Sequence, residues 1–289
     1  MKGIVLAGGT GSRLWPITRS ISKQLLPIYD KPLIYYPIST LMASGIREIL
    51  VITTPDEQSL FKKVLGNGSD FGIDISFKIQ EKPEGIAQAF LIAEDFISNS
   101  DVALILGDNL FYGAGLNNLL TQAKNNLGAH IFTYEVSNPQ DYGVLNLKAD
   151  GSPFSIVEKP THPQSNLAIT GLYFFDSSVV QFTKTISPSA RGELEITSVM
   201  GKYLEENRLS FTELPNGTAW LDTGTPKSLQ DAATFVRVIE ERTGQKIACL
   251  EEIALRNGWL SPEDLLEIIQ RYKNNDYGKY LIRLTKIKS

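Results

Sequence analysis

The sequence is poor in the residues that form disulfides and metal clusters. Its 289 residues include one cysteine, Cys249, and two histidines, His130 and His162. One cysteine excludes an internal disulfide, and two histidines argue against a multi-histidine zinc or iron centre. The first eight residues carry too short an apolar stretch for a signal peptide, and no uncharged apolar run approaches membrane-spanning length. These absences predict a soluble, cytoplasmic protein with no membrane partner.

A surplus of positive charge is also missing. Lysine and arginine total 28 against 32 aspartates and glutamates, which gives a net charge of -4. Non-specific affinity for nucleic acid depends on such a surplus, so we expect no nucleic-acid partner. Hydrophobic residues make up 42% of the chain and charged residues 21%. This composition is typical of a globular protein with a sizeable core, and it excludes global disorder.

Short apolar runs alternate with segments of helical period in the first half of the chain. Apolar runs of this length are typical of buried strands, and strands separated by helices predict right-handed βαβ units with a mostly parallel sheet. The expected strands are residues 3–7, 48–53, 75–79, 102–106 and 131–134. The expected helices are residues 33–44, 56–65, 86–96 and 116–125.

The rhythm changes after residue 136. Three apolar segments follow without intervening helices, which predicts a mixed or antiparallel region. They lie near residues 143–145, 156–158 and 172–175, and further helices are expected at 196–206, 227–241, 250–256 and from Pro262 onward. The prediction is an α/β protein with a Rossmann-like, mostly parallel central sheet flanked by helices. We expect one domain over residues 1–243 and a small helical C-terminal extension over 244–289, in the same compact unit.

A glycine-rich loop follows the first expected strand, and such a loop is a general site for anions. Residues Ser12-Arg13 stand where a Walker loop needs Lys-Ser or Lys-Thr. Leu14 stands where the dinucleotide fingerprint needs its third glycine, which excludes the NAD-dehydrogenase interpretation. What remains is a loop with Arg13 and, further on, Lys23, two cations that suit a triphosphate.

Several separate motifs extend this pattern in a fixed order. Together they resemble the nucleotide sugar pyrophosphorylases over nearly the whole chain, and within that family the thymidylyl-transferring branch. The resemblance implies Mg²⁺-assisted transfer from dTTP to glucose 1-phosphate, giving dTDP-glucose and pyrophosphate. The motifs are residues 8–16, 23–27, 30–37, 107–109, 142–144, 158–160, 191–197 and 220–225.

Two aspartates are candidates for a metal site. Asp108 follows the apolar strand 102–106, and Asp222 lies between an expected strand and the helix after Pro226. Open α/β sheets bind ligands at the carboxyl ends of their strands, where Asp108 should lie. Two carboxylates beside a triphosphate need a cation between them, and Mg²⁺ prefers such hard oxygen ligands. The resemblance assigns metal binding to the same two positions.

The resemblance also implies roles for individual residues. Arg13 and Lys23 would stabilise the leaving pyrophosphate, Lys159 would hold the attacking phosphate, and Gln80 with Gly85 would select the base. An amide can pair with O4 and N3–H of thymine or uracil, so Gln80 disfavours cytosine. The remaining nucleotide-binding candidates are Leu6, Gly8, Gly9, Gly11, Ser12, Gln24, Pro83 and Gly107, with Gln24 expected at the deoxyribose. The hexose candidates are Asn109, Tyr142, Gly143, Glu158, Thr170, Tyr173, Arg191 and Trp220, and Thr170 stands where the family usually has valine.

Members of this family are typically homotetramers that dTDP-rhamnose inhibits at a second nucleotide site, so we expect a homotetramer here. The positions that match this second site are Tyr112, Gly113, Cys249, Glu251, Glu252 and Arg256. Four positions depart from the family pattern, namely Asn117, Asn118, Asn216 and Leu250. Asn216 replaces an arginine that could fork onto a diphosphate, so we expect weak or altered feedback inhibition.

Two alternatives stay open from the sequence. The first is the same chemistry on UTP or ATP with another hexose 1-phosphate. The second is a non-catalytic sugar-nucleotide sensor on the same fold. Against the sensor stand the intact cations and aspartates, since a sensor needs no cations for both the attacking and the leaving group.

Overall fold

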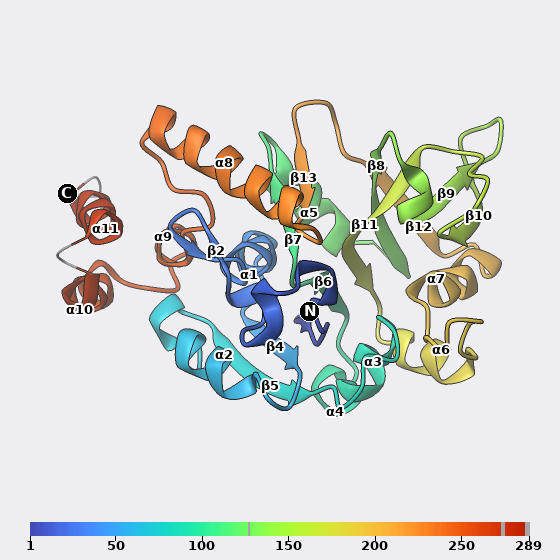
Figure 1. Ribbon diagram of the computed structural model, residues 1–289, viewed down its shortest axis with the longest axis horizontal. Helices are drawn as coiled ribbons and strands as arrows, with labels where there is room; N and C mark the ends of the chain where they lie inside the picture. Colours follow the sequence, from blue (N-terminus) through green and yellow to red (C-terminus); the bar gives the residue numbers. More distant parts are fainter. Residues whose placement is uncertain (127, 273–274, 287–289) are drawn as a thin grey trace.

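The computed structural model describes residues 1–126, 128–272 and 275–286, and a nine-stranded sheet runs through its centre (Figure 1). Four strands at one side are parallel and lie in the order β5-β4-β1-β6. They are β1 (Lys2–Ala7), β4 (Glu48–Thr53), β5 (Asp74–Ile79) and β6 (Val102–Leu106). The chain leaves β1 towards β4 and β5, then returns to the other side of β1 at β6. The predicted parallel core is confirmed.

Antiparallel pairing begins beyond β6. The sequence predicted it only after residue 136, but it also includes the strand expected at residues 131–134, which was wrongly grouped with the parallel strands. Strand β11 (Leu167–Phe175) pairs antiparallel with β6, with β8 (Ala129–Glu135) and with β9 (Gly143–Leu147). Strand β10 (Pro153–Glu158) closes this side against β9. Strand β12 (Leu209–Glu213), which the sequence analysis missed, pairs parallel with β8.

Helices cover both faces of the sheet, and each face has its own hydrophobic core. Alternation along β1 and β6 sends Val5 and Ile105 into one core and Ile4 and Leu104 into the other. The first core contains side chains of α1 (Tyr35–Ala43), α2 (Gln58–Leu65), α5 (Leu116–Lys124) and α9 (Leu250–Arg256). The second contains side chains of α3 (Gln88–Ile92), α4 (Glu94–Ile97), α6 (Val179–Thr185) and α7 (Ile196–Glu205). The single helix expected over residues 86–96 is wrong, because the chain forms the two short helices α3 and α4 there, separated at Ala93.

Two small antiparallel pairs stand on the carboxyl edge of the sheet. Strand β7 (Asn109–Tyr112) pairs with β13 (Ala219–Asp222), and β2 (Pro27–Ile28) pairs with β3 (Lys31–Pro32). Helix α8 (Pro226–Thr243) packs on both pairs through a third apolar cluster. Its N-terminus is fixed by a capping box between Thr225 and Ser228, and Gly244 ends it in the left-handed conformation.

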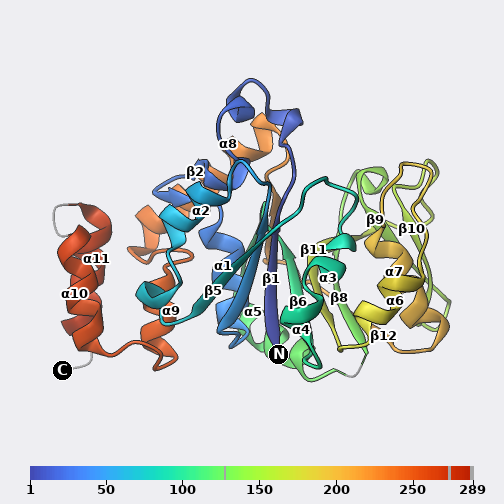
Figure 2. The ribbon, with the colours of Figure 1, turned by 90° about the horizontal axis from the view of Figure 1, so that it is seen from below.

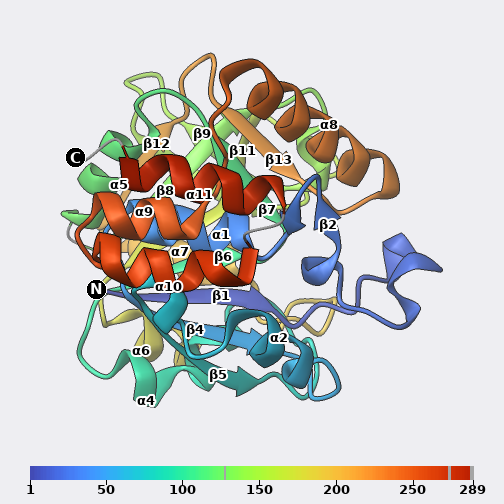
Figure 3. The ribbon, with the colours of Figure 1, turned by 90° about the vertical axis from the view of Figure 1, so that its left-hand side faces the viewer.

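The C-terminal helices lie at the end of the molecule opposite β9, β10, α6 and α7 (Figure 2). Helices α10 (Pro262–Tyr272) and α11 (Asp276–Lys286) lie side by side against α9 (Figure 3). They share a small apolar cluster that includes Cys249, Leu265 and Leu281. The domain boundary at residue 243 stays a prediction. Within the described part of the chain, no helix combines the length and the apolar character that a bilayer crossing requires.

Candidate active site

The loop after β1 lies between β1 and β6, where the chain stops adding strands on one side of β1 and continues on the other. Open α/β sheets bind ligands at such a switch point. The loop contains three short 3-10 turns, Ser12–Leu14, Ile17–Arg19 and Lys23–Leu25, and no α-helix. An anion at this loop would therefore be held by loop N–H groups and cations rather than by an α-helical N-terminus. Arg13 and Lys23 belong to the first and third of these turns.

The predicted base-selecting residues meet at the edge of β5. Gln80 follows β5 and packs so close to Gly8 that a Cβ added there would lie 2.1 Å from the Gln80 Oε1 atom. Gly85 has a φ of +104°, and a Cβ there would lie 2.3 Å from the carbonyl oxygen of Leu194. Close approach to backbone atoms and a positive φ therefore require glycine at position 85, and the predicted base-selecting amide lies against the glycine-rich loop at Gly8.

Three further nucleotide-binding candidates come together at the ends of β1 and β6. The backbone N–H of Gly107 donates to the carbonyl of Leu6 at 2.9 Å. The Gln24 side chain is buried beside Gly107, and its Oε1 accepts a hydrogen bond from the Ser22 hydroxyl at 2.6 Å. The structure therefore gathers Leu6, Gln24 and Gly107 at one edge. Gly9, Ser12 and Pro83 are exposed on loops that follow β1 and β5.

The two aspartates lie side by side because of the pairing between β7 and β13. The register places Asp222 opposite Asn109, next to Asp108. Thr223 fixes this geometry, since its backbone N–H and its hydroxyl both donate to the Asp108 carbonyl, at 3.1 and 2.9 Å. The sequence could not supply this register, because the two strands are separated by β8 to β12.

The two carboxylates have opposite electrostatic environments. Burial acts to raise the pKa of Asp108, but an ion pair with the Lys23 ammonium holds that pKa below its usual value. Burial and the neighbouring Asp108 carboxylate raise the pKa of Asp222 to about 6, against the opposing charges of Lys23 and Arg13. The Asp222 Oδ1 atom is buried and has no hydrogen-bond partner among the described residues.

This arrangement fits a divalent cation. A buried carboxylate oxygen without a partner needs a positive or donating group, and a cation shared by Asp108 and Asp222 would supply it. The described residues contain no group of three or more acidic, histidine or cysteine side chains that could hold a metal. Two carboxylates suit an ion that completes its coordination with phosphate oxygens and water.

A cavity of about 510 Å³ adjoins the aspartates on the side of β9, β10 and β11. A cavity of this size fits a phosphorylated hexose. Of the predicted residues, its lining includes Arg13, Asp108, Asn109, Tyr142, Gly143, Glu158, Lys159, Tyr173, Trp220 and Asp222. Other lining residues were not predicted from the sequence, among them Ile86, Thr197, Met200, Thr225 and Ser228. Ile86, Thr197 and Thr225 lie in or beside recognised motifs, whereas Met200 and Ser228 carry no such signal.

Polar contacts hold the cavity wall in place. Asn109 Oδ1 accepts from Trp220 Nε1 at 2.6 Å and from the Gly171 backbone N–H at 3.2 Å. The Tyr142 ring packs on Trp220 with ring centroids 5.1 Å apart. Lys159 follows β10 with a φ of +42°, which non-glycine residues rarely adopt and which is enriched at functional sites. Its backbone N–H donates to the Tyr142 carbonyl at 3.0 Å.

Two hexose candidates do not line the cavity. Thr170 lies on β11 between Ile169 and Gly171, which do line it. Because strand residues alternate, Thr170 faces away from the cavity and is fully buried, so its predicted place in the sugar pocket is wrong. The Arg191 guanidinium donates to both carboxylate oxygens of Glu195 at 2.9 Å and to Glu158 at 3.2 Å. Arg191 therefore contacts the cavity only through Glu158.

A second cavity, of about 320 Å³, lies between α1, α5 and α9. Five residues predicted for the second nucleotide site line it, namely Tyr112, Gly113, Cys249, Glu252 and Arg256. Glu251 does not, because its fully buried carboxylate accepts a hydrogen bond from Tyr277 at 2.6 Å. Of the four departures from the family pattern, only Asn117 lines the cavity.

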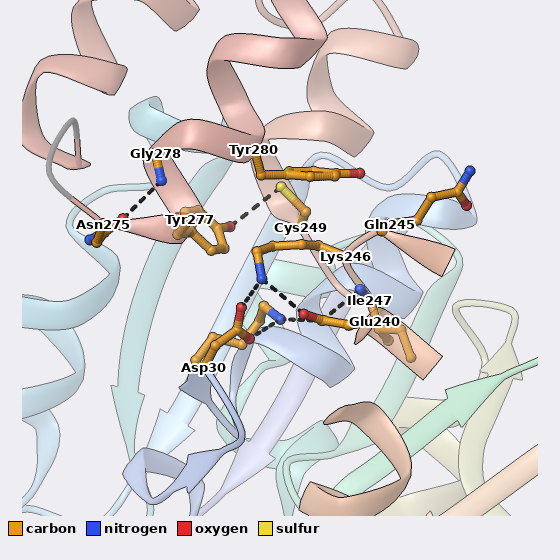
Figure 4. A network of polar contacts seen from close by, with 12 residues as sticks. Asp30, Glu240, Gln245, Lys246, Ile247, Cys249, Asn275, Tyr277, Gly278 and Tyr280 are labelled. Carbon is orange, nitrogen blue, oxygen red and sulfur yellow. Dashed lines mark hydrogen bonds and ion pairs between the residues drawn. The ribbon is translucent and has the colours of Figure 1, made fainter. Parts of the chain in front are cut away.

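Beside this second cavity, two lysines and two carboxylates form a partly buried charge cluster (Figure 4). Glu240 accepts from Lys31 and from Lys246, each at 2.9 Å, and from the backbone N–H of Ile247 at 2.9 Å. Both lysines also pair with Asp30. The cluster joins the hairpin of β2 and β3 to the end of α8 and the start of the C-terminal segment.

The fold, the glycine-rich loop and the paired aspartates define a phosphate-binding α/β enzyme of the nucleotidyl-transferring class. The chain belongs to the nucleotidyl transferase family, whose model matches residues 2–238. It is 55% identical over 287 residues to the glucose-1-phosphate thymidylyltransferase of Neisseria meningitidis serogroup A, covering 99% of this chain and 100% of that protein. It is 50% identical to the Mycobacterium tuberculosis protein of the same name, covering 98% of this chain and 99% of that protein.

Solved structures show the same fold. A Bacillus anthracis structure, described as a glucose-1-phosphate thymidylyltransferase in complex with sucrose, matches with a TM-score of 0.76 and 40% identity. The match covers 82% of this chain and 95% of that one. A UDP-glucose pyrophosphorylase complexed with UDP-glucose matches with a TM-score of 0.73 and 24% identity, over 82% of this chain and 98% of that one. This second likeness concerns the fold alone.

Proposed function

We propose that this protein transfers a thymidylyl group from dTTP to glucose 1-phosphate, giving dTDP-glucose and pyrophosphate. The observation that carries the proposal is the position of Asp108 and Asp222. They stand between the edge that holds Gln80 and Gly8 and a cavity of about 510 Å³. A nucleotide on that edge and a sugar phosphate in the cavity would meet at the two aspartates. The relatives named above support the same reaction.

The reaction needs no general base. A phosphate oxygen of glucose 1-phosphate attacks the α-phosphorus of dTTP, a new P–O bond forms, and the bond to the β-phosphate breaks so that pyrophosphate leaves in line. The nucleophile is already an anion at neutral pH. In agreement, no histidine is found among the residues described as lining the cavity. Burial lowers the pKa of His130 to about 4, so this side chain stays neutral on β8.

The protein contributes position and positive charge. Arg13 lies at the edge of the cavity beside the aspartates, where its guanidinium would stabilise charge on the leaving pyrophosphate together with Lys23. Lys159 lines the cavity from the end of β10 and would hold the attacking phosphate, while Glu158 would accept hydrogen bonds from sugar hydroxyls. Mg²⁺ held by Asp108 and Asp222, when bound, would neutralise charge at the α-phosphate.

The base and the ribose would lie over the loop that follows β1. The Gln80 amide can pair with O4 and N3–H, which thymine and uracil share. Gln24, buried beside Gly107, is the candidate for the deoxyribose. The amide reads thymine and uracil alike, so uridylyl transfer from UTP is the second candidate function.

One assay tests the proposal. The protein is incubated with Mg²⁺, glucose 1-phosphate and each of dTTP, UTP, CTP, ATP and GTP, and released pyrophosphate is measured. We expect release to be fastest with dTTP and absent when glucose 1-phosphate is omitted. Equal rates with ATP, or no release with any nucleotide, would contradict the proposal. The second outcome would favour the sugar-nucleotide sensor.

The proposal extends to assembly and regulation. We expect a homotetramer in the cytoplasm, where dTTP is available, and only weak inhibition by dTDP-rhamnose at the second cavity. The substitution Asn117 in the lining of that cavity supports altered binding there. Light scattering measures the assembly, and inhibition by micromolar dTDP-rhamnose would contradict the expectation for regulation.

A further inference from the structure

A chain of hydrogen bonds connects an exposed carboxylate to the base-selecting amide. The Gln80 Nε2 atom donates to Gln88 Oε1 at 2.6 Å, and Gln88 Nε2 donates to Glu84 Oε2 at 2.8 Å. We call Glu84, Gln88 and Gln80 the amide relay. Gln80 is buried, Gln88 is half-buried at the start of α3, and Glu84 is exposed.

The direction of the amide relay is fixed by groups that cannot reverse their hydrogen-bonding role. An ionised carboxylate only accepts, so Gln88 must turn its NH₂ towards Glu84 and its oxygen towards Gln80. The backbone N–H of Glu84 donates to the same Gln88 oxygen at 3.3 Å. The Gly85 carbonyl accepts from Gln80 Nε2 at 3.5 Å. Reversal of the Gln80 amide would put its oxygen against two acceptors.

The backbone under the amide relay is itself held in place. The N–H of Leu194 donates to the Glu84 carbonyl at 2.7 Å, and the N–H of Ala87 donates to the Leu194 carbonyl at 3.1 Å. These bonds tie the loop before α3 to the segment before α7. Ala87 and Ala89, on either side of Gln88, are fully buried. The Gln88 side chain therefore starts from a fixed position.

This fixed direction matters because pyrimidines differ in hydrogen-bonding polarity. Thymine and uracil offer an acceptor at position 4 and a donor at N3, whereas cytosine offers a donor at position 4 and an acceptor at N3. A free glutamine amide adapts to either pattern by rotating about its terminal torsion, which is broad and roughly two-fold. An amide that is held in one orientation pairs well with only one of them.

We propose that Gln88, oriented by Glu84, is a positioning residue that locks the Gln80 amide and so sets the preference for 4-keto over 4-amino pyrimidine nucleotides. The inference rests on the proposed function and goes beyond it, since it assigns discrimination against cytosine to two residues outside the predicted nucleotide-binding set. Gln80 alone supplies the pairing groups. The amide relay determines which way the oxygen and the NH₂ of Gln80 face.

Three variants separate locked, free and reversed amides. Gln88→Leu removes the acceptor and frees Gln80. The double variant Glu84→Gln with Gln88→Glu keeps an acceptor towards Gln80. In this variant the new amide at position 84 donates to the new carboxylate at position 88. Gln88→Lys offers only donors. The ammonium would pair with Glu84 and donate to Gln80, so that the Gln80 oxygen turns towards position 88. We measure kcat/KM for dTTP and dCTP with glucose 1-phosphate, and each variant's melting temperature.

The expected readout is the ratio of kcat/KM for dTTP to that for dCTP. Loss of one or two hydrogen bonds should lower this ratio roughly 10- to 100-fold in Gln88→Leu, and more in Gln88→Lys. The double variant should keep the ratio within about threefold of the wild type, within the range of one weak hydrogen bond. A merely structural role would lower kcat/KM for both nucleotides equally. Unchanged ratios in folded Gln88→Leu and Gln88→Lys would overturn the inference.

A milder variant keeps the test decisive if those proteins do not fold. Glu84 is exposed on a loop, and Glu84→Gln removes only the carboxylate that fixes the orientation of the Gln88 amide. It should lower the dTTP to dCTP ratio several-fold, as for the loss of about one hydrogen bond, and an unchanged ratio would overturn the inference. If the wild type uses dTTP but no variant changes the ratio, the inference fails alone. If the wild type uses neither pyrimidine nucleotide, the proposed function fails.

Discussion

Two clusters of two carboxylates and two cations lie in this protein, and they behave in opposite ways. In the cluster of Figure 4, Glu240 accepts three hydrogen bonds, and each lysine contacts both acids. At the active site, Lys23 pairs with Asp108 alone, and Asp222 keeps a buried oxygen without a partner among the described residues. In the first cluster the charged groups pair with one another, whereas in the second a carboxylate oxygen is left for a bound cation or donor.

The pKa values express the same contrast. Burial acts to raise the pKa of Asp30, but Lys31 and Lys246 outweigh it and hold that pKa below its usual value. At Asp222, burial and the Asp108 carboxylate prevail and raise the pKa to about 6. The same residue types therefore stabilise the fold in one place and keep a binding site unsatisfied in the other. The composition of a charge cluster does not distinguish a structural cluster from a binding site, but the pairing of its side chains does.

The largest effect on stability should come from breaking the self-satisfied cluster. Glu240→Ala leaves the buried Lys31 and the half-buried Lys246 with Asp30 as their remaining acid, so we expect the free energy of unfolding to fall by about 3–5 kcal/mol. Urea denaturation measures this change. Turnover per folded molecule should stay near that of the wild type. Glu241→Ala is the control, because its ion pair with Arg237 is exposed and should contribute less than about 1 kcal/mol. Equal effects of the two variants would remove the contrast.

The next effect should appear in catalysis and not in stability. Arg13→Ala removes a charge that is needed only when pyrophosphate leaves, so kcat should fall by about 10²–10³, or roughly 3–4 kcal/mol. The free energy of unfolding should change by less than about 0.5 kcal/mol, because Arg13 is exposed. Arg19→Ala, a change of another exposed arginine in the same loop, is the control and should retain normal turnover. Near-normal turnover in Arg13→Ala would exclude Arg13 from the mechanism.

The smallest effect concerns pH and has a defined sign. The pKa of Asp222 in the folded protein is about 6, above its usual 3.8. Its favourable contribution to stability is therefore complete below about pH 4 and is lost as pH rises through 6. Asp222→Asn escapes this loss, so in chelator-containing buffer it should exceed the wild type in stability by about 2 kcal/mol at pH 8, after allowance for solvent screening, and by little at pH 4.

The variant should also lose turnover, since a neutral amide binds a divalent cation poorly. Denaturation curves at both pH values, with activity measured in parallel, check this prediction. If the stability difference between the variant and the wild type does not change between pH 4 and pH 8, the pKa of Asp222 is not raised in the ligand-free protein.

Much of the fold could be predicted from local sequence. Strand β6 is a wholly apolar run, and β1 and β4 are apolar over residues 4–7 and 49–52, so their buried positions follow from composition. The break between α3 and α4 could not be seen, because a helical period runs through it. Strand β12 alternates apolar and polar residues as a half-buried strand does, but it was missed because the run is only five residues long. Tertiary pairing with β8 makes it a strand.

The candidate site divides in the same way. The motifs predict roles for Asp108, Asp222 and Lys159, because each residue type suits a phosphate or a cation. Their proximity could not be predicted, since it depends on the register between β7 and β13. The error at Thr170 has the same origin. A motif gives the neighbourhood of a residue, but the alternation of β11 decides which way its side chain faces.

The pairing of β7 with β13 also has a consequence during synthesis. A nascent chain emerges from the ribosome from its N-terminus, so Asp108 and the glycine-rich loop appear long before Asp222. Until β13 has emerged and aligned with β7, the growing chain has only one carboxylate of the proposed metal pair in place. Truncated translation products that end before Trp220 should therefore lack the paired carboxylates and show no turnover.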